Sequence, residues 1–145
     1  MKQTIASIAL LLLCASSAYA RNDTVEYDIA AALVAEHHEN LLSDVPIFMK
    51  EQSHPSVTKT SGSFTANRPA RSAMTSDESA CHRAFLSAII SLQTRAKSEG
   101  GNAVIDIGSN TNDAAITRAG KYRCVVGNIV ARVNLSGLAV QLAEH

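Results

Sequence analysis

The sequence predicts an α+β fold, in which a small antiparallel sheet carries one long helix on one face. Two observations predict it. Residues 77–99 repeat apolar side chains with the period of a helix, whereas residues 103–107 and 122–135 alternate apolar and polar side chains as strands do. A shorter helix, over residues 29 to about 40, is expected ahead of these elements.

The first twenty residues have the three-part pattern of a signal peptide. Lys2 supplies the basic start, Ile5–Leu13 form an apolar run, and the small residues of Ala18-Tyr19-Ala20 end it. We therefore expect cleavage after Ala20. The apolar run is about half of the roughly 20 residues that a membrane span requires, so no stable span is predicted.

The alternative to simple cleavage is a lipoprotein acylated at Cys14. Such a site places a small residue directly before its cysteine, and Leu13 stands there instead. Cleavage is therefore the favoured interpretation, with a periplasmic or secreted product. The remaining residues, 21–145, have the usual length of a single domain.

Two of the three cysteines, Cys81 and Cys124, lie in the predicted mature chain. An even number of cysteines in an exported protein predicts a disulfide, here one that joins Cys81 to Cys124. It would close a loop of about 44 residues and stabilise the fold by about 4 kcal/mol in the chain-entropy model. Two free thiols are the alternative.

The first mature residues carry weak signals. Residues 21–26 are polar and are expected to be a loose lead-in. Asp28 is a suitable N-cap for the short helix over residues 29–40, because its carboxylate can accept a backbone N–H. Val45–Met49 have the composition of a strand, and Pro46 places that strand at a sheet edge or at its own start.

Residues 51–75 are rich in Ser, Thr, Pro, Asn and Arg and show no apolar period. Such a composition offers little apolar surface to bury, so we expect a long polar surface loop. A loop of this length in a compact domain is either functional or mobile, and the sequence leaves that choice open.

The helix over residues 77–99 has the strongest signals. Ser76 is a suitable N-cap, acidic residues follow in the first turn, and Gly100-Gly101 end the pattern. At 100° per residue, Cys81 falls on the broad apolar arc that faces the core.

Leu86 and Ile90 fall outside that arc and form a second apolar stripe. The stripe is available to another element or to another subunit. Cover by the short N-terminal helix is the favoured interpretation, and an interaction surface is the alternative.

Residues 122–135 form the longest strand candidate, but Cys124 and Ile129 then point to opposite faces. A bulge near Gly127 would reset the alternation and turn Cys124 toward the helix. Residues 109–120 are expected to be a polar connection. A turn over 134–137 should lead into a last short strand over 138–142.

Six short segments, spread over most of the chain after residue 20, carry a resemblance to known proteins. They are Asp44–Lys50, His54-Pro55, Ser79–Ala88, Leu92–Lys97, Gly101–Val104 and Tyr122–Cys124. Together they resemble a group of small exported bacterial proteins that often bear the label "excinuclease ATPase subunit". More distantly, the chain is similar to the stress-sensor lipoprotein of the Rcs phosphorelay and to a family labelled as heavy-metal-binding. These resemblances imply an α+β fold and bring no catalytic motif.

The ATPase label does not fit the chain. A phosphate-binding glycine loop that ends in Lys-Ser or Lys-Thr is missing from the sequence. With 13 basic and 13 acidic residues, the chain also lacks the basic excess that favours nucleic-acid binding. There is no Gly-x-Ser-x-Gly elbow and no Cys-x-x-Cys pair, so we predict no catalytic residue and no cofactor.

Histidines are the weak candidates for a metal site. His37 and His38 lie beside two glutamates, and His54 or His82 could add a ligand. Adjacent residues on a helix point about 100° apart, however, and no pair has the spacing of a zinc site. Solvated surface is the favoured interpretation.

Taken together, these patterns predict a non-enzymatic envelope protein that acts as an interaction or sensing module. Its partner would be another envelope protein or a second copy, bound through the Leu86/Ile90 stripe, the 51–75 loop, or both. The alternative is a periplasmic metal-binding or metal-response protein that uses His37, His38 or His54. A hydrolase is a minor third hypothesis, because it would need a pocket that pairs a serine with a histidine.

Overall fold

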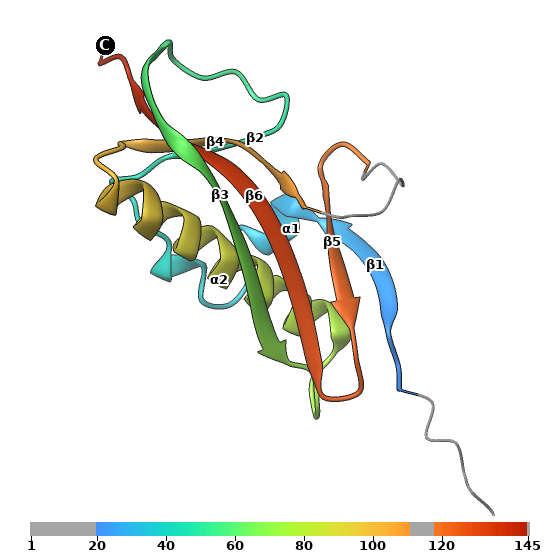
Figure 1. The fold of residues 1–145 in the computed structure, drawn as a ribbon. Helices are drawn as coiled ribbons and strands as arrows, with labels where there is room; N and C mark the ends of the chain where they lie inside the picture. The colour runs from blue at the N-terminus through green and yellow to red at the C-terminus, as the bar shows by residue number, and fades with distance from the viewer. Residues whose placement is uncertain (1–19, 111–117, 145) are drawn as a thin grey trace, which may run out of the picture.

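A computed structural model describes residues 20–110 and 118–144. It confirms the α+β prediction, with a six-stranded sheet, one long helix and one short helix (Figure 1). The helices are α1 (Ile29–Ala32) and α2 (Asp77–Ser98), and a 3-10 turn covers His38–Asn40. The strands are β1 (Asp23–Asp28), β2 (Ile47–Met49), β3 (Val57–Arg71), β4 (Ala103–Ser109), β5 (Lys121–Val126) and β6 (Val130–Leu142).

Strand β6 is the centre of the sheet. Strand β3 pairs with β6 along its length on one side, while β5 and then β4 pair with β6 on the other. Strands β1 and β2 lie outside β5 and β4. The expected antiparallel arrangement is wrong for one pair, since β2 and β4 run parallel. Parallel neighbours require a long crossover, and here the chain passes through β3 and α2 between them.

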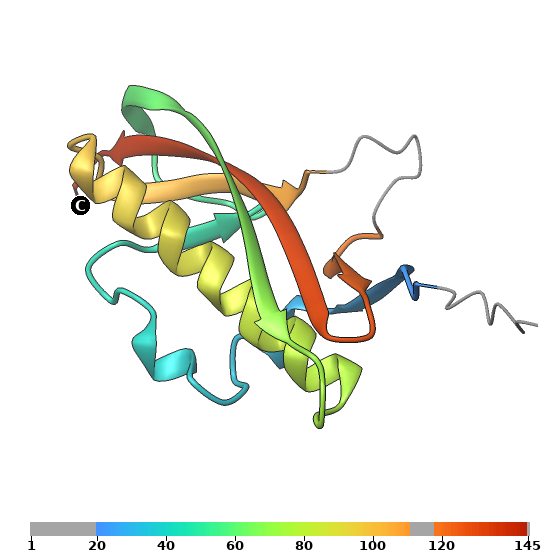
Figure 2. The ribbon, with the colours of Figure 1, turned by 60° about the horizontal axis from the view of Figure 1, so that its bottom comes forward.

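Helix α2 runs diagonally along one face of the sheet (Figure 2). Ser76 caps it, because the Ser76 hydroxyl oxygen accepts a hydrogen bond from the Ser79 N–H at 3.1 Å. The helix ends before Gly100, whose φ of +78° suits glycine. Its inner face is fully buried against the sheet and consists largely of small or apolar side chains, which are Ala80, Cys81, Ala84, Phe85, Ala88, Ile89, Leu92 and Ala96.

Two predictions for the residues that follow Ala20 need correction. Residues 21–26 are not a loose lead-in, because β1 pairs with β5 and turns Val25 and Tyr27 toward the core. The helix expected over residues 29–40 is regular only in α1. The Asp28 side chain makes no capping bond, and His37 has a φ of +73°, which breaks a helix.

The predicted polar loop over residues 51–75 is also corrected, since most of it is strand β3. Only Ala66 in this strand is buried, so the composition resembles that of a loop. The backbone groups along one edge of the strand pair with β6 instead, from Val57 opposite Leu142 to Arg71 opposite Val130, with two register shifts before Gly62. This pairing depends on a distant segment, and local composition does not reveal it.

The predicted strand over residues 122–135 is a hairpin. Gly127 donates its N–H to the Val130 carbonyl at 2.9 Å, and β5 and β6 pair on either side of that turn. The bulge expected near Gly127 is therefore wrong. The turn nevertheless has the effect expected of the bulge, because it lets Cys124 point into the core. The turn expected over residues 134–137 is wrong as well. Gly137 lies within β6, where a Cβ atom would approach Val104 Cγ1 to 2.8 Å.

Two predicted segments lie wholly or largely outside the residues that the structure describes. The predicted signal peptide lies outside the described residues, apart from Ala20. Most of the polar connection expected over residues 109–120 also lies outside the described residues. Its first residue, Ser109, is the last residue of β4. Within residues 20–110 and 118–144, no helix has both the length and the apolar character of a membrane span.

Candidate functional site

The first turns of α2 meet β5 at Cys81 and Cys124. Their sulfur atoms lie 2.07 Å apart, which is the distance of a disulfide, and their Cα atoms lie 5.9 Å apart. Both residues are completely buried. This contact ties the start of the helix to the sheet at the place where the remaining site residues gather.

His82 follows Cys81 and carries a buried polar cluster. Its Nδ1 atom lies 2.7 Å from the Tyr122 hydroxyl oxygen, and its Nε2 atom lies 3.4 Å from a Glu78 carboxylate oxygen. An ionised carboxylate only accepts hydrogen bonds, so this arrangement assigns the proton to Nε2 and lets Nδ1 accept from Tyr122. The Tyr27 ring meets the imidazole edge-on at 5.8 Å.

Burial dominates the chemistry of Tyr122, which is 1% exposed and packs on the Phe85 ring at 4.4 Å. Removing a phenolate from water is costly, so burial raises the pKa of the Tyr122 hydroxyl above its ordinary value. The pKa of Tyr27 is raised for the same reason. Tyr122 therefore keeps its proton well above neutral pH, and with the His82 proton on Nε2 its hydroxyl donates to Nδ1.

This shift predicts a loss of stability at alkaline pH. Above about pH 10, Tyr122 ionises in the unfolded chain but keeps its proton in the folded one, which favours unfolding. The free energy of unfolding should fall as the pH rises beyond that point, and Tyr122→Phe should make the fall shallower. Urea titrations of both proteins at about pH 8 and about pH 11 measure the difference. If the free energy of unfolding falls equally with pH in the two proteins, the raised pKa of Tyr122 is contradicted.

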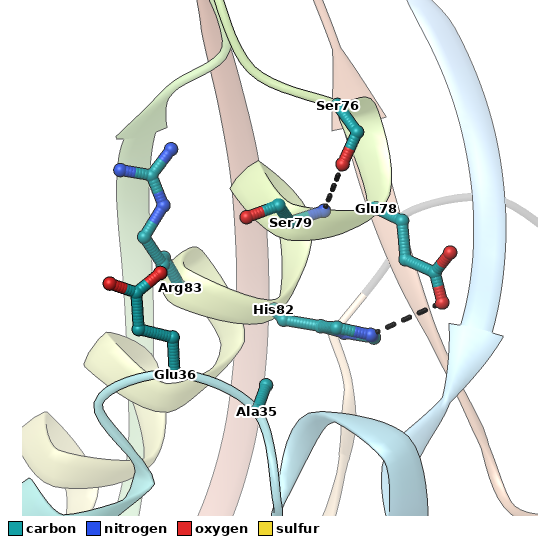
Figure 3. Close-up of a pocket in the computed structure, with 7 residues that line it drawn as sticks. All are labelled: Ala35, Glu36, Ser76, Glu78, Ser79, His82 and Arg83. Carbon is teal, nitrogen blue, oxygen red and sulfur yellow. Dashed lines mark hydrogen bonds and ion pairs between the residues drawn. The ribbon is translucent and has the colours of Figure 1, made fainter.

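A pocket of about 230 Å³ opens beside this cluster (Figure 3). It lies between the first turns of α2 and the segment that follows α1. Six of its seven lining residues have polar or charged side chains, although their apolar stems also form part of the wall. The lining residues are Ala35, Glu36, Ser76, Glu78, Ser79, His82 and Arg83.

Arg83 is held at the rim by a 2.7 Å hydrogen bond from its guanidinium to the Arg71 carbonyl. Its Nε–H is buried and has no partner among the described residues, which leaves one donor unsatisfied. With two carboxylates, one imidazole and one guanidinium, the pocket is suited to a polar ligand or to a polar side chain of a partner.

The pocket does bring serines and a histidine together, as the hydrolase hypothesis requires, but not as a nucleophile and its base. Ser76 uses its hydroxyl oxygen to cap α2, and both His82 nitrogens face other partners. A serine nucleophile needs a hydrogen bond to the histidine that activates it. No such bond joins Ser76 or Ser79 to His82 among the described contacts.

The predicted Leu86/Ile90 interaction stripe needs correction, because Leu86 is 2% exposed. The segment after α1 covers this flank of the helix. Gln93 on the same flank fixes the segment by accepting from the Leu42 N–H and donating to the Leu42 and Val45 carbonyls. Leu86 is therefore a core residue, while Ile90 is half-buried and lines a different groove.

The histidines named as weak metal ligands are not gathered into one site. His37 and His38 are exposed in the turn after α1 and lie within 4 Å of neighbouring glutamates. His54 packs beside the Phe48 ring at 5.7 Å. Residues 20–110 and 118–144 hold no cluster of three His, Cys, Asp or Glu side chains that could bind a metal ion.

Sequence reasoning did not identify the importance of His82 and Tyr122. Their one usable signal was position, since His82 follows a core cysteine and Tyr122 lies two residues before the other. Glu78 and Arg83 carried no signal, because charged residues at the start of a helix are usual on a solvated face.

Comparison of the chain with family models, with curated proteins and with solved structures finds no match. The proposed function therefore rests on the sequence patterns and on the described residues.

Proposed function

We propose that this protein is an exported, non-enzymatic module of a bacterial envelope that binds or senses a partner through the pocket beside His82. One observation carries the proposal: the buried Cys81–Cys124 contact lies next to a pocket whose histidine is held by structural partners. Disulfides persist in oxidising compartments, which agrees with the signal-peptide pattern of residues 1–20.

The arrangement of His82 favours recognition over catalysis. A general base must reach the proton that it abstracts, whereas His82 is 8% exposed and both its nitrogens face protein groups. The Glu36 and Glu78 carboxylates and the Arg83 guanidinium remain at the rim, where they can pair with a ligand. Because α2 and β5 are joined beneath the pocket, a ligand there contacts an element that is tied to the sheet.

The metal-binding alternative is not carried forward, since no described contact favours it. His37 and His38 each approach one or two glutamates on a solvated turn, which is ordinary surface chemistry.

Site-specific photo-cross-linking in bacteria that express the full chain tests the proposal. A photoreactive residue at Ser79, inside the pocket, should give an adduct in the periplasmic or secreted fraction. The same residue at Glu144, which is exposed and outside the pocket, is the matched control and should give none. Mature protein confined to the cytosol would contradict the export, and equal labelling from both positions would contradict recognition at the pocket.

A further inference from the structure

A second groove, of about 480 Å³, lies between the outer flank of α2 and the edge strand β3. It shares no lining residue with the pocket beside His82. Hydroxyl groups recur along the helix at intervals of three or four residues, and an arginine stands on either side. The lining residues are Arg68, Ser87, Ile90, Ser91, Thr94, Arg95 and Ser98.

The groove carries positive charge that the described residues do not neutralise. Arg68 makes no ion pair among them, and its guanidinium donates to the Ser91 hydroxyl at 3.1 Å across the groove. Arg95 is positioned over the Phe64 ring at 4.5 Å and pairs with Glu99 at 3.0 Å. Two guanidinium groups and one carboxylate therefore border the groove, and both arginines are exposed.

Strand β3 adds a backbone template along the same groove. It pairs with β6 on one side only, so its other edge has no strand partner among the described elements. The register is regular from Ser63 to Arg68, whereas it shifts before Gly62, and Pro69 lacks an N–H. In this window alternate residues direct N–H and C=O groups outward, which makes about six groups available to an added strand.

We propose that β3 binds an extended acidic segment of a partner protein, which adds as a strand between Ser63 and Arg68. Its backbone pairs with the free edge, and its carboxylates reach Arg68 and Arg95 in the groove. Strand addition of this kind draws affinity from the backbone and specificity from side chains at alternate positions. The inference goes beyond the proposed function, since it concerns a surface separate from the pocket.

Charge argues against a second copy of this chain as the occupant. Strand β3 contains Lys59, Arg68 and Arg71 and no acidic residue, so two copies that paired edge to edge would bring like charges together. An acidic strand has the complementary charge.

The probe is a synthetic peptide of about eight residues, with Glu at alternate positions and Val or Thr between them. Calorimetry should show that it binds the full mature protein, and that a Lys-for-Glu peptide does not. Hydrogen exchange should slow at amides between Ser63 and Arg68 when the acidic peptide is present. Protection elsewhere, or equal binding of both peptides, would overturn the proposal.

Arg68→Ala combined with Arg95→Ala should weaken peptide binding by about tenfold. Arg132→Ala is the matched control, because Arg132 is exposed on the neighbouring strand β6 and does not line the groove. If the free protein sediments as a dimer that forms by pairing of two β3 edges, the inference is also overturned. Cross-linking from Ser79 reports on the pocket alone, so failure of the peptide to bind and failure of the proposed function are separate results.

Discussion

Reduction of the Cys81–Cys124 disulfide is expected to lower the free energy of unfolding by about 4 kcal/mol. The two cysteines are 43 residues apart, and a crosslink over such a loop removes many conformations from the unfolded chain. Small domains have about 5–15 kcal/mol of stability in total, so this loss decides how much of the chain stays folded. Urea unfolding of the oxidised and reduced proteins measures it directly.

Cys81→Ala combined with Cys124→Ala is the matched variant, because it removes the crosslink without adding a free thiol or a reductant. Both sulfurs are fully buried, so the double variant also loses some packing and should be no more stable than the reduced protein. If oxidised and reduced chains unfold at the same urea concentration, the crosslink does not hold α2 to β5 in solution.

Gln93→Leu should destabilise the fold by about 3 kcal/mol or more, although leucine has a similar size. Gln93 is 2% exposed and holds three backbone groups, namely the N–H and C=O of Leu42 and the C=O of Val45. These groups belong to a segment with little regular structure. Without the amide, the Leu42 C=O keeps one described bond, from the Val45 N–H at 3.2 Å, whereas the Leu42 N–H and the Val45 C=O have no other described partner. Thermal or urea unfolding with a circular dichroism signal provides the measurement.

Gln141→Leu is the control for this substitution. Gln141 donates a single exposed hydrogen bond to the Gly100 carbonyl, which water can replace. Its loss should therefore cost less than about 1 kcal/mol. Similar losses for the two variants would mean that the Gln93 bonds do not fix the segment after α1.

Local signals were sufficient for α2. Its cap at Ser76, the apolar arc and the Gly100 stop all act within a few residues of one another, and the structure confirms the helix they predict. Strand β4 forms where it was predicted, but its expected alternation is wrong, because both of its faces are buried. Ala103 and Ile105 pack in one cluster and Val104 and Ile107 in the other, with an irregularity at Asp106, whose φ is +53°.

Pairing between segments that are far apart in the chain explains why some elements were not predicted. Strands β1 and β3 are polar edge strands, and each pairs along one edge with a strand far along the chain, which is β5 for β1 and β6 for β3. The turn at Gly127 and the glycine at Gly137 look alike in sequence, yet the first ends a strand and the second makes room for Val104. Only the surrounding packing distinguishes them.

One part of the candidate functional site could be predicted from the sequence and the other could not. The cysteine pair could be predicted, since composition and the leader pattern indicate an oxidised chain, and the structure brings its sulfurs to disulfide distance. The pocket could not, because Glu36 approaches His82 and Arg83 only after the segment beyond α1 folds over the helix.

By itself the sequence determined the α+β class, the long helix with its caps, and the choice of cysteine partners. These properties depend on side-chain chemistry and on the periods of 3.6 and 2 residues, which are readable within one segment. Only the tertiary structure decided that β3 is an edge strand, that Leu86 is buried, and that His82 meets Tyr122. Those outcomes depend on which surfaces meet, and the free energy of that contact is shared between segments that lie far apart in the chain.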